Sequence, residues 1–233
     1  HTRRRLAREG SQGGDGGIFG TSGNYTGGIS AAVDLTGDGY PEIVSGRNAW
    51  KVDWKVVNNA PSVTLTQLWV NMDGGDGYPA IADIDLNGTP EVILAANGTL
   101  RVLDGATGKL WCGIDPTGVA CQNNDAARTK SINIRGSGLG GPPTVADFDG
   151  DGRPEVGIAA ASAYAVYDFN RMGEQIVKPM ADPNPAAGAI YVRWFKTTQD
   201  QSSNATGSSV FDFQGDGAAE VVYADECYIR VYS

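Results

Sequence analysis

Histidine and cysteine are scarce in this chain of 233 residues, which holds one His and three Cys. The only histidine is His1, so neither a Ser-His-Asp nor a Cys-His arrangement can be built in the body of the chain. No motif singles out a lysine as the base of a polysaccharide lyase, although Lys55, Lys130 and Lys196 are present. We therefore predict that the protein is not an enzyme, and a lyase or hydrolase module is the least favoured alternative.

The few cysteines give only a weak indication of the redox compartment. Cys112 and Cys121 bracket the segment GIDPTGVA, which contains Pro and Gly and could close as a small disulfide. Cys227 would then be left over, and three reduced thiols are the alternative.

Long apolar runs are absent too, since no hydrophobic stretch approaches the length of a membrane-spanning helix. The formal net charge is −9, which argues against nucleic acid as a partner. Positive charge is concentrated in residues 1–17, a Gly-rich segment that contains Arg3, Arg4, Arg5 and Arg8. We interpret this segment as a disordered or processed arm, and docking onto an acidic neighbour is the alternative.

Glycine is abundant, with 33 residues, and short Val, Ile, Thr and Tyr runs alternate with Gly/Asp/Asn clusters. This composition predicts an all-β fold with many turns. Four segments repeat one pattern: small apolar residues, then an acidic loop with Gly at its sixth position and Glu at its ninth, then a β-branched run. The loops lie at 34–42, 83–91, 147–155 and 212–220, and such spacing suits a repeated four-stranded sheet.

Each loop is predicted to bind Ca²⁺, a cation that prefers six to eight oxygen ligands. Side chains at positions 1, 3, 5 and 9 and the carbonyl at position 7 would supply the oxygens. The four expected sets are Asp34, Thr36, Asp38, Tyr40 and Glu42; Asp83, Asp85, Asn87, Thr89 and Glu91; Asp147, Asp149, Asp151, Arg153 and Glu155; and Asp212, Gln214, Asp216, Ala218 and Glu220. Up to four ions are expected, with the third loop tightest because it has the most carboxylates. The first and fourth loops, with Thr36 and Gln214 at position 3, are expected to bind more weakly.

An EF-hand or a magnesium site fits these loops less well. An EF-hand needs Glu at position 12 and flanking helices, whereas the third loop has Ile158 there and Pro154 at position 8. Magnesium keeps several waters and suits so many protein oxygens poorly. An acidic surface turn would account for one copy but hardly for four in phase with the same strands.

These loops, with the segment from Phe19-Gly20 into the first of them, resemble the FG-GAP repeat of integrin α-subunits and the related bacterial VCBS-type repeats. The similarity spans residues 18–233. It implies a β-propeller, here with four visible blades of four-stranded antiparallel sheets. In the second repeat, strands are expected near 79–84, 91–96, 98–104 and 109–113, with an Asn-Gly hairpin turn.

The resemblance is incomplete, because family propellers usually have about seven blades and the fourth blade here stops at YIRVYS. We expect the chain to be a fragment, or a partial propeller completed by its own N-terminal segment or by a strand donated from another copy. Of the sequons, Asn24 and Asn204 are the better glycosylation sites. The five tryptophans are expected to pack between blades rather than stack on sugars.

The sequence thus predicts an extracellular or cell-surface, calcium-stabilised module with a structural role in adhesion or self-assembly. Its partners would be other proteins or further copies of the chain, with no nucleic acid and no membrane insertion. The alternative is a carbohydrate-binding lectin that uses exposed aromatic side chains to bind glycans.

Overall fold

The computed structural model describes residues 30–111, 131–169, 190–201 and 204–233. The basic arm at 1–17, the Cys112/Cys121 pair and Asn24 lie outside these residues, so the expectations for them stay predictions.

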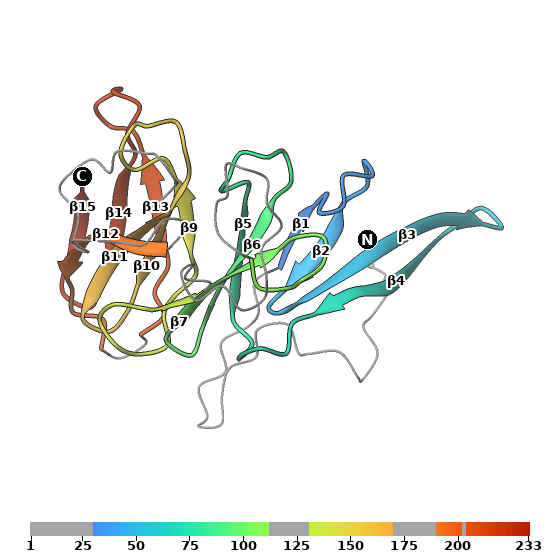
Figure 1. Cartoon of the computed structure of the whole chain (residues 1–233), viewed down its shortest axis with the longest axis horizontal. Coiled ribbons are helices and arrows are strands. Elements are labelled where there is room, and N and C mark those ends of the chain that lie inside the picture. Colours follow the sequence, from blue (N-terminus) through green and yellow to red (C-terminus); the bar gives the residue numbers. More distant parts are fainter. Residues whose placement is uncertain (1–29, 112–130, 170–189, 202–203) are drawn as a thin grey trace.

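The described strands form four antiparallel sheets, each made of strands that are consecutive in the chain (Figure 1). Sheet 1 holds β1 (Ser30–Val33), β2 (Glu42–Ser45), β3 (Asn48–Val57) and β4 (Ala60–Val70). Sheet 2 holds β5 (Tyr78–Ala82), β6 (Glu91–Ala96), β7 (Thr99–Asp104) and β8 (Ser131–Asn133). Sheet 3 holds β9 (Thr144–Ala146), β10 (Glu155–Ala159), β11 (Ala163–Phe169) and β12 (Ile190–Thr197). Sheet 4 holds β13 (Ser208–Phe211), β14 (Glu220–Ala224) and β15 (Ile229–Tyr232).

The all-β expectation is confirmed, but sheet 4 has three strands among the described residues rather than four. Within these same residues, no helix combines the length and apolar character that crossing a bilayer requires.

The second repeat has the expected hairpin turn and also a strand that was not expected. Asn97 and Gly98 both have positive φ, 51° and 75°, so the Asn-Gly pair makes the expected hairpin turn between β6 and β7. Residues 112 and 113 of the strand expected near 109–113 lie outside the described residues. The described part does pair with β7, because Leu110 bridges Leu103 and the Trp111 amide donates to the Val102 carbonyl at 2.8 Å. β8, which was not expected, pairs with β7 over Thr99–Arg101 and supplies the fourth strand of the sheet from farther along the chain.

Three apolar clusters lie between consecutive sheets and hold them in a row. Val44 of sheet 1 packs with Leu94 of sheet 2. Ile93, on the opposite face of sheet 2, packs with Ile158 of sheet 3. Tyr164 of sheet 3 packs with Tyr223 of sheet 4. Because successive strand residues point to opposite faces, each middle sheet contributes one face to each of two clusters.

The tryptophans mostly follow the expected packing role. Trp50, Trp69 and Trp111 are buried, and the half-buried Trp194 stacks with Tyr164 at a centroid distance of 6.1 Å. Trp54 differs, since it lies on the long β3–β4 hairpin and is 58% exposed.

The first strands of the sheets lie next to one another: β1 contacts β5, β5 contacts β9, and β9 contacts β13. Each acidic loop joins the first strand of a sheet to its second, so the four loops lie along one edge of the row (Figure 1). The loops of sheets 3 and 4 touch directly, because the amide of Ala219 donates to the carbonyl of Asp147 at 2.8 Å.

Candidate metal centres

The first aspartate of every loop accepts hydrogen bonds from the amides of its own loop. Its two carboxylate oxygens bind N–H groups that the tight turn directs inward, as expected for an Asx-type turn. The donors are Gly37 and Gly39 for Asp34 (both 2.7 Å), Asn87 and Gly88 for Asp83 (3.0 and 2.8 Å), Gly150 and Gly152 for Asp147 (2.6 and 2.8 Å), and Gly215 and Gly217 for Asp212 (2.5 and 3.0 Å).

The glutamate at position 9 closes each loop from its other end. Its side chain is buried, and its Oε2 accepts the amide N–H of the residue after the first aspartate. The pairs are Glu42 with Leu35 (2.9 Å), Glu91 with Ile84 (2.9 Å), Glu155 with Phe148 (2.7 Å) and Glu220 with Phe213 (2.8 Å). The repeated sequence therefore folds into one repeated backbone frame.

One loop has an exception to the glycine pattern within this frame. Position 4 is Gly in three loops and has positive φ there, but in the second loop it is Leu86, with φ 57°. Bulky residues such as leucine rarely adopt this left-handed conformation, because the side chain then lies too close to the backbone. The second loop therefore carries local backbone strain at Leu86.

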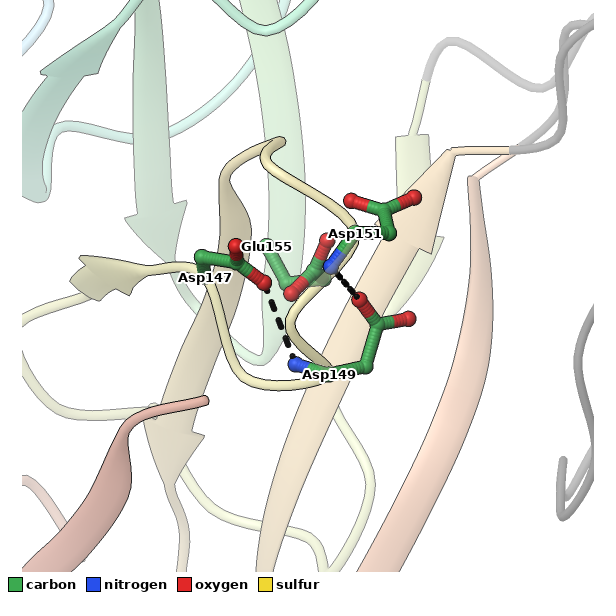
Figure 2. Close-up of side chains that lie close together, drawn as sticks. All are labelled: Asp147, Asp149, Asp151 and Glu155. Carbon is green, nitrogen blue, oxygen red and sulfur yellow. Dashed lines mark hydrogen bonds between the residues drawn. The ribbon is translucent and has the colours of Figure 1, made fainter. Parts of the chain in front are cut away.

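The carboxylates converge in only two of the four loops. In the described part of the chain, ligand oxygens within 4.8 Å of one another occur in two groups: Asp147, Asp149, Asp151 and Glu155, and Asp83, Asp85 and Glu91. Figure 2 shows the four acids of the third loop around one small volume, with the amides of Asp149 and Asp151 bonded to the preceding acids. These are the loops with an acid at position 3.

Burial, with a smaller contribution from neighbouring carboxylates, raises the pKa of the glutamate in each of these two groups. Burial raises the pKa of Glu155 to about 9, and the charges of Asp168, Asp149 and Asp151 add to the rise, although the Phe148 amide opposes it. Burial likewise raises the pKa of Glu91 to about 8, with Asp85 next in importance. Both glutamates therefore keep a proton near neutral pH unless positive charge lies close to them, and a cation among the oxygens would favour their ionised form.

Sequence reasoning missed the basic residue beside the third loop. Arg193 on β12 is 7% exposed, and its guanidinium lies 2.5 Å from Asp149 and 2.9 Å from Asp168 on β11. Burial raises the pKa of Asp149, and the Arg193 charge opposes that rise. Charged residues within otherwise apolar strands were the only signal in the sequence. Arg193 and Asp168 are too far in sequence from the third loop for that signal to predict the contact.

The first loop has a lysine instead. Lys51 Nζ lies 3.1 Å from Asp38 Oδ2 and 4.0 Å from Glu42 Oε1, with both the lysine and Asp38 partly exposed. The Tyr40 amide, followed by Lys51, holds the pKa of Asp38 below its usual value. Such an exposed ion pair is weak. Thr36 Oγ1, the expected third ligand, is buried without a hydrogen-bond partner, so this oxygen is available to a cation.

The fourth loop keeps the frame but lacks the converging acids. Gln214 stands at position 3, and hydrogen bonds from its own loop, that of Gly217 first, lower the pKa of Asp212. The expectation of weaker sites in the first and fourth loops stays a prediction. Asn204, an expected glycosylation site, is half-buried, and its amide nitrogen donates to the Gln201 carbonyl at 3.3 Å.

Comparison with known proteins adds no assignment: no family model matches the chain, and no curated protein matches it. The chemical interpretation therefore depends on the donor set, which consists of carboxylate, amide, hydroxyl and carbonyl oxygens. Oxygen-only donor sets favour hard cations.

Proposed function

We propose that the chain is an extracellular calcium-binding module whose loops 83–91 and 147–155 each hold one Ca²⁺, with a structural role in adhesion or self-assembly. The observation that carries this proposal is the convergence of Asp147, Asp149, Asp151 and Glu155 in the third loop. Loops 34–42 and 212–220 bind more weakly, because they offer fewer converging carboxylates.

The ion supplies positive charge where the fold has gathered negative charge. Asp147 and Glu155 already hold the two ends of the loop through amide hydrogen bonds, so the site is largely shaped before binding. Asp149 and Asp151 contribute the remaining carboxylates. The modest affinity typical of extracellular calcium modules would suffice at the millimolar calcium outside cells.

A β-propeller arrangement agrees with several features of the fold. The sheets follow one another along the chain, their first strands lie side by side, and every acidic loop joins the first and second strands of its sheet. The resemblance to FG-GAP repeats likewise predicts successive antiparallel sheets, each with an acidic loop that joins two of its strands.

Calorimetric titration with Ca²⁺ tests the proposal. We expect about two ions in the stronger binding phase, and Asp151→Asn should remove the tighter of them. Asp53→Asn is the matched control, because Asp53 is an exposed acid outside the loops that pairs with Lys55. Binding that is absent, or that is reduced equally by both substitutions, would refute the calcium role.

One observation favours a lectin as the second candidate. A hollow of about 390 Å³ beside the first loop is lined by the exposed aromatics Tyr40 and Trp54 together with Asp38 and Lys51. Aromatic faces beside polar groups suit sugar rings. Binding on a glycan array that Trp54→Ala abolishes and Met72→Ala leaves unchanged would support this function.

A further inference from the structure

One face of sheet 4 is exposed, whereas the equivalent face of each other sheet is covered by the sheet that follows it. The residue after the first aspartate of each loop is Leu35, Ile84, Phe148 or Phe213. The first three are 0%, 0% and 7% exposed and pack in the clusters between their own sheet and the next. Phe213 is 59% exposed.

A second set of equivalent positions repeats this difference. In each sheet, the residue two positions after the loop glutamate lies on the second strand and pairs with a residue of the third strand. These third-strand residues are Ala49, Val102, Val166 and Val231. The first three are fully buried, whereas Val231 is 57% exposed. Phe211 and Ile229, on the same face as Val231, are 62% and 82% exposed. In each of the other sheets, this face is covered by the following sheet.

Sheet 1 shows the opposite deficit at two positions of its outer face, although Trp50, which pairs with Ile43 on this face, is only 6% exposed. The residue two positions before the first aspartate of each loop is Ala32, Ile81, Val145 or Val210. The last three pack against the preceding sheet, whereas Ala32 is exposed. The residue after the glutamate is Ile43 in sheet 1, which is only half-buried, while its equivalents Val92, Val156 and Val221 are fully buried.

We propose that the outer face of sheet 4 (Phe211, Phe213, Ile229 and Val231) binds the outer face of sheet 1 (Ala32 and Ile43) of a second copy, so that copies associate head to tail. Within the chain, three contacts join one sheet to the next, and each uses one face of the earlier sheet and the opposite face of the later sheet. The exposed face of sheet 4 is equivalent to the first of these surfaces, and the outer face of sheet 1 is equivalent to the second. They lie at opposite ends of the row of sheets, so they meet between molecules (Figure 1).

This contact joins two different surfaces, so it leaves a binding face at each end of the complex. Such heterologous contacts give rings if the rotation closes and filaments if it does not. The inference deepens the self-assembly role proposed above by naming the partner and the surfaces, and it does not depend on calcium.

Sedimentation velocity over a range of protein concentrations, with calcium present, tests the proposal. The unaltered chain should form larger species as concentration rises. Phe213→Asp blocks one face and Ala32→Asp the other, so each variant alone should stay monomeric at concentrations at least tenfold above those at which the unaltered chain associates. Met72→Asp, at an apolar site that is 69% exposed and belongs to neither face, should assemble normally.

Mixing the two blocked variants gives the sharpest result. Each retains one intact face, so an equimolar mixture should form a dimer of two different variants and nothing larger. A mixture that stays monomeric, an unaltered chain that is monomeric throughout, or equal loss in all three variants would overturn the proposal. Val231→Thr, which keeps the side-chain shape, should also weaken assembly and replaces Phe213→Asp if circular dichroism shows that variant unfolded.

Calcium titration of the same samples separates the two proposals. Binding of calcium by a chain that never assembles would overturn the head-to-tail contact alone. Assembly that persists without any calcium binding would overturn the calcium role alone.

Discussion

The first and third loops share one backbone frame but differ in the charges around it. In both, the first aspartate holds the loop amides and the last glutamate holds the amide after that aspartate. The third loop adds Asp149, and its four acids converge although a buried arginine pairs with one of them. The first loop has Thr36 at that position and an exposed lysine on Asp38. The frame therefore shapes the turn, while position 3 and the neighbouring strands decide the capacity for a cation.

Removing calcium should have the largest effect. At about 10 mM calcium, roughly 100 times a Kd near 10⁻⁴ M, one site stabilises the fold by about 2.7 kcal/mol. For a chain of this size, that corresponds to a fall in melting temperature of roughly 8 °C on addition of a chelator. Differential scanning calorimetry with and without chelator measures it, and identical melting curves would contradict the calcium role.

Asp151→Ala should separate the third loop from the first. In calcium, it should lower the free energy of unfolding by about 2 kcal/mol, since a roughly 30-fold loss of affinity costs that much. Thr36→Ala, its matched change in the first loop, should cost less than about 0.5 kcal/mol, as is usual where no strong interaction is lost. In chelator the difference should vanish. Urea unfolding checks both variants, and equal losses in calcium would break the comparison.

Calcium should abolish a pH dependence of the free energy of unfolding that the calcium-free chain shows. The raised pKa values of Glu91 and Glu155, about 8 and about 9, mean that the calcium-free folded chain keeps protons which the unfolded chain loses above about pH 4.5. Its stability should therefore fall as pH rises from about 4.5 to about 9, by at most about 1.4 kcal/mol per pH unit for each group. Calcium binds the carboxylate form, so saturated protein should not lose stability over this range.

Urea unfolding at several pH values, with and without chelator, measures this dependence. Glu155→Gln keeps an oxygen for the Phe148 amide but cannot ionise, so it should remove roughly half of the calcium-free slope. A calcium-free profile that is flat between pH 5 and 9 would show that these groups ionise normally in the folded chain.

Converting the first loop should give the smallest effect and sharpen the comparison most. Thr36→Asp with Lys51→Ala adds the missing acid and removes the competing cation. One further calcium equivalent should appear in calorimetric titration, with a gain near 1 kcal/mol at about five times its Kd. Lys51→Ala alone is the control and should add no equivalent of comparable affinity. No added binding in the double variant would mean that the first loop cannot bring its oxygens together.

Much of the fold and of the site could be predicted from short stretches of sequence. The turn at Asn97-Gly98 and the frame from Asp147 to Glu155 each involve only a few consecutive residues, so spacing and backbone preference suffice. The outer strand β8 of sheet 2 was missed because it joins β7 across a longer connection. Arg193 and Lys51 were missed for the same reason, since each reaches its loop from a neighbouring strand.

By itself, the sequence determined the all-β class and the nine-residue loops, because alternating residues, glycines and aspartates act on their immediate neighbours. Only the tertiary structure decided which acids converge, which basic side chain pairs with them, and which sheet faces are covered. Those properties depend on strand pairing and sheet stacking between residues far apart in the chain. Phe148 and Phe213 occupy the same place in two almost identical loops, yet one is buried and the other exposed because a following sheet covers only the first.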